Sequence, residues 1–223
     1  MSSDEFDWVA QRGRMVKNQL ERRHIYDQAV LQAMGSIPRE LFVPRRFQNA
    51  AYADSPLPLP AGQTISQPYI VAYMLQSLCL EPHFKVLEVG TGSGYAAAIL
   101  SQLVREVYTI EWHEQLVAYA RQRFIDLQIH NIQVRQGDGT LGWPEQAPFN
   151  AILVSAGGPE VPRNLKHQLT IGGRLVIPVG GESHQQDLLC ITRDDEFRFS
   201  GRNLGPVAFV PLRGEQGWDR NKD

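Results

Sequence analysis

A glycine-rich stretch near residue 90 carries the clearest chemical pattern in this sequence of 223 residues. Gly90, Gly92 and Gly94 follow an apolar run at alternate positions, and Glu88 lies two residues before the first of them. Glycines let backbone N–H groups approach a ligand closely. A loop between a strand and a helix also lies at the edge of the sheet where open α/β folds bind ligands. The stretch therefore indicates a site for a small molecule.

Two classes of ligand compete for this loop. A dinucleotide fingerprint requires a third glycine in the pattern G-x-G-x-x-G, and Tyr95 stands where that glycine would fall. Dinucleotide binding is therefore disfavoured. A G-x-G-x-G loop preceded by an acid resembles the first motif of the Rossmann-like methyltransferases. That resemblance implies S-adenosyl-L-methionine as the cofactor.

Two more acids follow the next two apolar runs. Glu111 lies 19 residues after Gly92, where the next strand should deliver a carboxylate to the ribose hydroxyls. Asp138, followed by Gly139, ends the strand after that, and in the methyltransferases an acid here faces the adenine edge. Simpler interpretations stay open, because Glu111 is also suited to a helix N-terminus and Asp138 to an ordinary Asp-Gly turn. Trp112 either flanks the adenine or packs against the protein.

A second motif lies upstream, at residues 61–72, and reads AGQTISQPYIVA. It resembles the GQTIS-x-P signature of the protein-L-isoaspartate O-methyltransferases. Residues 37–44, 51–59, 172–180 and 209–212 also resemble that family, so the similarity runs from about residue 19 to residue 212. The sequence departs from the family pattern at Asn150, at residues 155–159 and in the tail at 213–218.

The resemblance implies roles for individual residues. It assigns the catalytic serine to Ser66, although a serine two residues before Pro68 is also placed to cap a helix, and both roles can coexist. The residues that it implies for cofactor binding are Gln63, Thr64, Ile65, Ser66, Glu88, Gly90, Thr91, Gly92, Gly94, Glu111, Asp138 and Gly139.

The implied activity is transfer of a methyl group from S-adenosylmethionine to the free carboxylate of isoaspartyl residues in damaged proteins, which starts their repair. Such a carboxylate has a pKa near ~3.5 and is ionised at neutral pH, so the reaction requires no general base. Alternatives are a methyltransferase of the same fold with another substrate, such as nucleic acid, and a non-catalytic cofactor-binding module. Residues 154–159 lack an Asn-Pro-Pro-Tyr type of motif, and the glycine loop is intact.

The elements that must position these residues alternate along the chain. Apolar runs predict strands at 85–89, 107–110, 132–134, 151–154, 174–177, 187–192 and 207–212, and helices are expected at 69–80, 95–103, 113–127 and 163–169. Repeated βα units predict an α/β, Rossmann-like, doubly wound and mostly parallel sheet with an antiparallel C-terminal strand. Residues 1–68 are expected to form an N-terminal helical and loop extension, and residues 69–223 the cofactor-binding domain.

Composition and charge limit the classes of partner that we expect for this chain. The net charge is -2 and the basic residues are scattered, which disfavours nucleic acid. No apolar stretch reaches the ~18 residues needed to cross a membrane, and the acidic N-terminus does not resemble a signal peptide. We therefore expect a cytoplasmic monomer that acts on proteins. No metal site is expected, because the histidines are dispersed: His24, His83, His113, His130, His167 and His184.

Overall fold

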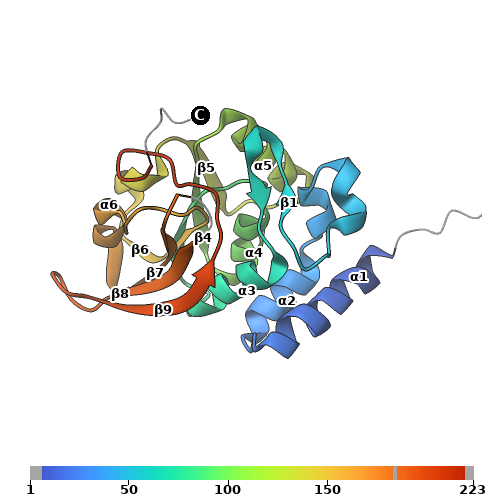
Figure 1. The fold of residues 1–223 in the computed structure, drawn as a ribbon, viewed down its shortest axis with the longest axis horizontal. Helices are drawn as coiled ribbons and strands as arrows, with labels where there is room; N and C mark the ends of the chain where they lie inside the picture. Colours follow the sequence, from blue (N-terminus) through green and yellow to red (C-terminus); the bar gives the residue numbers. More distant parts are fainter. Residues whose placement is uncertain (1–6, 183–184, 219–223) are drawn as a thin grey trace, which may run out of the picture.

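The computed structural model describes residues 7–182 and 185–218, and its centre is a sheet of seven strands (Figure 1). The strand order is β5-β4-β3-β6-β7-β8-β9; the neighbours from β5 to β7 are parallel, and β8 and β9 are antiparallel. This confirms the predicted fold class. The strands are β3 (Lys85–Val89), β4 (Glu106–Glu111), β5 (Ile132–Gln136), β6 (Phe149–Val154), β7 (Leu169–Gly180), β8 (Gln186–Arg193) and β9 (Phe199–Val207).

Two hydrophobic clusters cover the two faces of the sheet. Alternate residues of β3 separate between them: Val86 joins the cluster that contains helix residues such as Leu100, whereas Leu87 joins the cluster that contains Leu165. This alternation is the period-2 pattern of a strand buried on both sides. The helices of the alternating region are α3 (Pro68–Ser77), α4 (Tyr95–Leu103), α5 (Glu114–Asp126) and α6 (Arg163–His167).

The start of the N-terminal segment is helical, as predicted, and the structure shows one break in it. Helix α1 (Trp8–Met15) continues through a π turn (Val16–Leu20) and a 3-10 turn (Glu21–Arg23). His24 then adopts a positive φ of 67° and ends the segment. Helix α2 (Gln28–Ser36) begins where the Asp27 carboxylate accepts hydrogen bonds from the backbone N–H groups of Ala29 and Val30, so Asp27 is its N-cap.

The proline-rich segment that follows contains only short elements. These are three 3-10 helices, η3 (Arg39–Phe42), η4 (Arg45–Ala50) and η5 (Pro60–Gly62), and a two-stranded antiparallel sheet of β1 (Leu57–Pro58) and β2 (Thr64–Ile65). Its buried side chains join the same cluster as those of α3 and α4. The division at residue 68 stays a prediction, and the segments on its two sides share one hydrophobic core.

One predicted strand is wrong. The last strand, β9, spans Phe199–Val207 and pairs with β8, whereas the prediction placed it at 207–212. Asp195 turns the chain at the hairpin by accepting hydrogen bonds from the backbone N–H groups of Phe197 and Arg198. An edge strand packs few side chains, so the polar sequence of β9 lacks the apolar signal that a central strand carries. Residues 209–212 are apolar because Phe209 packs against one hydrophobic cluster of the sheet and Val210 and Leu212 pack in the other.

Candidate active site

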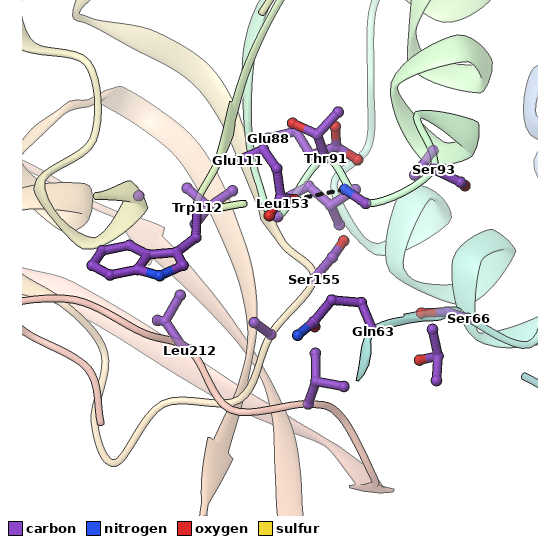
Figure 2. Close-up of a pocket in the computed structure, with 18 of the residues that line it drawn as sticks. Gln63, Ser66, Glu88, Thr91, Ser93, Glu111, Trp112, Leu153, Ser155 and Leu212 are labelled. Atoms are coloured by element: carbon purple, nitrogen blue, oxygen red, sulfur yellow. Dashed lines mark hydrogen bonds between the residues drawn. The ribbon is translucent and has the colours of Figure 1, made fainter. Parts of the chain in front are cut away.

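An open cavity lies at the carboxyl ends of β3, β4 and β6, with about 940 Å³ of space between atoms, including its mouth. In the view of Figure 2, Trp112 and Leu212 lie toward one end and Ser66 toward the other. Ten of the residues predicted for the site line this cavity, and Gly94 and Asp138 do not. The ten are Gln63, Thr64, Ile65, Ser66, Glu88, Gly90, Thr91, Gly92, Glu111 and Gly139.

The glycine loop needs backbone conformations that other residues rarely adopt. The φ angles of Gly90, Gly92 and Gly94 are 91°, 54° and 89°. A Cβ atom at Gly94 would also lie 2.8 Å from the ring of Phe124 in α5. Gly94 therefore allows the loop to pack against α5, and Gly90 and Gly92 face the cavity.

Glu111 holds this loop in place. Its Oε2 accepts a hydrogen bond of 2.8 Å from the backbone N–H of Gly92 (Figure 2), and its Oε1 accepts one of 2.9 Å from the N–H of His113. The acid therefore supports the first turn of α5 and lines the cavity at the same time. A carboxylate held in this way keeps lone pairs that can accept hydrogen bonds from a pair of hydroxyls.

Glu88 is buried beneath the loop. Its Oε2 accepts a hydrogen bond of 2.6 Å from Thr109 Oγ1, which lies 2.6 Å from Thr91 Oγ1. Its Oε1 is buried and has no hydrogen-bond partner within the described chain. Burial raises the pKa of Glu88 to about 8; the Thr109 hydrogen bond opposes the rise and the charge of Glu111 adds to it. At neutral pH the carboxyl group mostly keeps its proton and can donate a hydrogen bond.

Asp138 points toward the C-terminal tail. Its Oδ1 accepts hydrogen bonds from the N–H and hydroxyl of Thr140, and its Oδ2 accepts one of 2.7 Å from the N–H of Glu215. The neighbouring Gly139 lines the cavity, and a Cβ there would lie 2.3 Å from Val89. The Asp-Gly turn is therefore present, and the expected adenine contact of Asp138 stays a prediction.

The signature segment forms the wall opposite the glycine loop. Gln63 Nε2 lies 3.3 Å from His113 Nε2, which connects this wall to the turn after Glu111. The N-cap of α3 is Gln67, and its side chain makes no capping hydrogen bond. The Ser66 side chain lines the cavity and appears in no hydrogen bond between described residues. The capping role that was open for Ser66 is therefore not seen.

The sequence assigned no individual residue of the tail to the site. Residues 210–213 line the cavity, and Leu212 donates a backbone hydrogen bond of 2.8 Å to Gly157. Trp218 Nε1 donates another of 2.9 Å to the same carbonyl group. The only signal was the apolar run at 209–212, which also fits a strand. Other residues of the cavity wall that the sequence did not single out are Val71, Met74, Ser93, Tyr95, Ala96, Ser155 and Ala156.

These residues fit an adenosyl cofactor. Glu111 offers acceptors for hydroxyl groups, the glycine loop allows close backbone approach, and Trp112 and Leu212 add apolar surface. The described residues include no cluster of three or more His, Cys, Asp or Glu side chains that would hold a metal ion, and His184 lies outside them. In the same described part of the chain, every helix is too short or too polar to span a bilayer.

Comparisons with known proteins agree with this site. The model of the family "Protein-L-isoaspartate(D-aspartate) O-methyltransferase (PCMT)" matches residues 10–217. The chain is 53% identical over 204 residues to protein-L-isoaspartate O-methyltransferase 2 of Pelobacter propionicus, covering 92% of this chain and 91% of that protein. It is 51% identical to the protein of the same name from Marinobacter nauticus, covering 98% and 100%.

A solved structure is also similar. It is a candidate protein-L-isoaspartate O-methyltransferase from Plasmodium falciparum in complex with S-adenosyl-L-homocysteine. Its TM-score is 0.79 at 26% identity, over 91% of this chain and 98% of that one. The family match covers nearly the whole sequence, including the signature segment, the glycine loop and the tail. This chain therefore belongs to the protein-L-isoaspartate O-methyltransferase family.

Proposed function

We propose that this chain is an S-adenosylmethionine-dependent protein carboxyl O-methyltransferase that methylates isoaspartyl and D-aspartyl residues in damaged proteins. The observation that carries the proposal is the cavity in which the Ser66 wall faces the glycine loop and Glu111 (Figure 2). The proposed cofactor site and the serine of the family signature thus line the same cavity. Family membership supports the choice of substrate.

The cofactor end of the cavity is the end nearer Trp112 and Leu212. Glu111 is proposed to accept hydrogen bonds from the ribose hydroxyls, and Trp112 to flank the adenine. The backbone at Gly90 and Gly92 is proposed to lie against the amino-acid portion. When bound, S-adenosylmethionine supplies a methyl group that its sulfonium charge activates for displacement.

The substrate end is the Ser66 wall. The α-carboxylate of an isoaspartyl residue is already ionised at neutral pH, so this chain has no proton to remove from it. Ser66 is proposed to donate a hydrogen bond from its hydroxyl to that carboxylate and so to fix the direction of the attacking oxygen. Apolar side chains such as Met74 and Leu212 line the same cavity, and we propose that they help to exclude water once cofactor and peptide are bound. Alignment in a dry site is the main contribution of the protein.

The proposed substrate is a flexible segment of a damaged protein, and the proposed enzyme is a cytoplasmic monomer. The methyl ester formed on the peptide then collapses spontaneously to a succinimide, which reopens in part to normal aspartate. That later step occurs on the product and needs no group of this chain.

An assay with labelled S-adenosylmethionine tests the proposal against its alternatives. Label is expected in an isoaspartyl peptide and not in RNA or DNA, and it should be released as a volatile product in base because the bond is an ester. Base-stable label in nucleic acid would support another substrate. Binding of S-adenosylhomocysteine without transfer to any of these substrates would support a non-catalytic module.

A further inference from the structure

Arg39 is a buried cation that the proposed chemistry does not use. It begins η3, its side chain is fully buried, and burial lowers the pKa of its guanidinium. No carboxylate forms an ion pair with it among the described residues. Burying a guanidinium without an opposite charge costs free energy, so other contacts must compensate for the burial of Arg39.

The guanidinium joins three segments around the cavity. Its Nε donates a hydrogen bond of 2.7 Å to the carbonyl oxygen of Ala51, and its Nη2 donates one of 2.7 Å to the carbonyl oxygen of Ser66. Its carbon Cζ lies 4.8 Å from the centroid of the Tyr95 ring. Tyr95 lines the cavity and is the first residue of α4, directly after the glycine loop. The Arg39 side chain thus connects the wall of the cavity that contains Ser66 to the wall formed by the glycine loop and Tyr95.

The two hydrogen bonds come from two nitrogens, Nε and Nη2, of one rigid and planar guanidinium. The remaining nitrogen, Nη1, and the Tyr95 hydroxyl are both buried, and the interaction with Tyr95 opposes the lowering of the Arg39 pKa. The guanidinium is therefore held by two carbonyl groups and one aromatic face. A lysine would keep the charge, but its single ammonium cannot reproduce this fixed fork.

We propose that Arg39 is a positioning residue that fixes the backbone of Ser66, and with it the serine hydroxyl, relative to the glycine loop. This inference rests on the proposed function. The bond is made to the carbonyl group of Ser66 itself, so rotation of that peptide would break it. A small displacement of the hydroxyl reduces alignment of the substrate oxygen more than it reduces cofactor binding.

The first test compares Arg39→Lys with Arg45→Lys, since Arg45 is exposed in the neighbouring η4. Arg39→Lys is expected to lower kcat on an isoaspartyl peptide about tenfold or more, with the Kd for S-adenosylhomocysteine within about twofold of wild type. Arg45→Lys is expected to match wild type. An unchanged kcat, or an equal loss in kcat and cofactor affinity, contradicts the proposal.

A double-mutant cycle asks whether Arg39 acts through Ser66. Arg39→Lys is combined with Ser66→Ala, and kcat is measured for the four proteins. If Arg39 positions the hydroxyl, its substitution costs much less once that hydroxyl is gone. Losses that simply multiply would show that the two residues act independently, and would overturn the proposal.

Hydrogen exchange gives a readout that needs no substrate. Amides 64–67 are expected to exchange faster in Arg39→Lys than in wild type, and those of α5 at the wild-type rate. Unchanged exchange at 64–67 contradicts the proposal, even if the wild-type protein proves inactive on isoaspartyl peptides and the proposed function fails. If Arg39→Lys does not fold, Arg39→Gln replaces it; failure of both to fold would indicate a purely structural role and also overturn the proposal.

Discussion

At the scale of single residues, the site separates into groups that hold the loops and groups that face the cavity. Glu111 does both, because its two oxygens accept hydrogen bonds from Gly92 and His113 while the carboxylate lines the cavity. Ser66 differs, since its hydroxyl has no hydrogen-bond partner in the described part of the chain. A polar group that faces a cavity without a partner is available to a ligand.

Ser66→Ala is expected to lower turnover much more than cofactor affinity. The lost hydrogen bond matters most where the reacting oxygen must be aligned, so kcat falls while the Kd for S-adenosylhomocysteine stays near wild type. Ser200→Ala, at the exposed edge strand β9, serves as the matched control. Normal turnover together with a stability loss of roughly 0.5–2 kcal/mol would contradict the orienting role and indicate that Ser66 only stabilises the fold.

The raised pKa of Glu88 predicts that the free energy of unfolding depends on pH. The folded chain keeps the Glu88 proton up to a pKa of about 8, whereas the unfolded chain releases it near 4.5. Between these values the folded state binds one more proton, so this group makes the free energy of unfolding fall as pH rises, by up to about 1.4 kcal/mol per pH unit. The slope ends above pH 8, where both states are ionised.

Urea unfolding between pH 5 and pH 8 measures this contribution. Glu88→Gln keeps the shape of the side chain and an acceptor for Thr109, and it should remove the fall in the free energy of unfolding that Glu88 causes. The control is Glu114→Gln at an exposed position, which should leave that fall unchanged. An identical slope in wild type and Glu88→Gln would mean that Glu88 is ionised in the folded protein throughout this range.

At the scale of elements, three loops and the tail meet at one edge of the sheet. The tail is tied down twice, by Gly157 after β6 and by Asp138 after β5. A Cβ on Gly214 would lie 2.0 Å from an Asp138 oxygen, so the turn there fits only a glycine. The strand ends thus hold both the cofactor loops and the segment that closes the cavity.

Asp138→Ala tests whether that acid holds the tail or the adenine. Loss of the hydrogen bond to Glu215 should speed tryptic cleavage after Arg213 and raise KM for the peptide. The loss in affinity for S-adenosylhomocysteine should stay below that of Glu111→Ala, which is expected to reach roughly 1.5–3 kcal/mol. Normal cleavage combined with a loss as large as that of Glu111→Ala would favour the adenine contact expected from the sequence.

The central elements could be predicted from the sequence because their signals are local. Apolar runs located the strands β3 to β8. The rest depends on contacts between distant residues. The bond from Asp138 to Glu215 joins positions 77 residues apart, and nothing near Arg39 in the sequence indicates that its charge is buried. The polar edge strand β9 was missed for the same reason, since its pairing with β8 defines it.

At the scale of the whole molecule, residues from the N-terminal segment, the sheet and the tail line the same open cavity. Residues as far apart as Ser66 and Leu212 line it, so the cavity forms only when segments distant in the sequence fold together. The N-terminal segment shares a hydrophobic core with α3 and α4, which fixes the segment that contains Ser66 to the rest of the fold. The net charge of -2 fits the expectation that the partner is a protein and not a nucleic acid.

The most direct test of this account compares methylation of two peptides that differ only in one aspartyl linkage. The isoaspartyl peptide should be methylated with a kcat/KM at least about a hundredfold above that of the normal aspartyl peptide, because a displaced carboxylate loses its alignment with the methyl group. Equal kcat/KM values for the two peptides, measured with the same preparation and labelled S-adenosylmethionine, would contradict it.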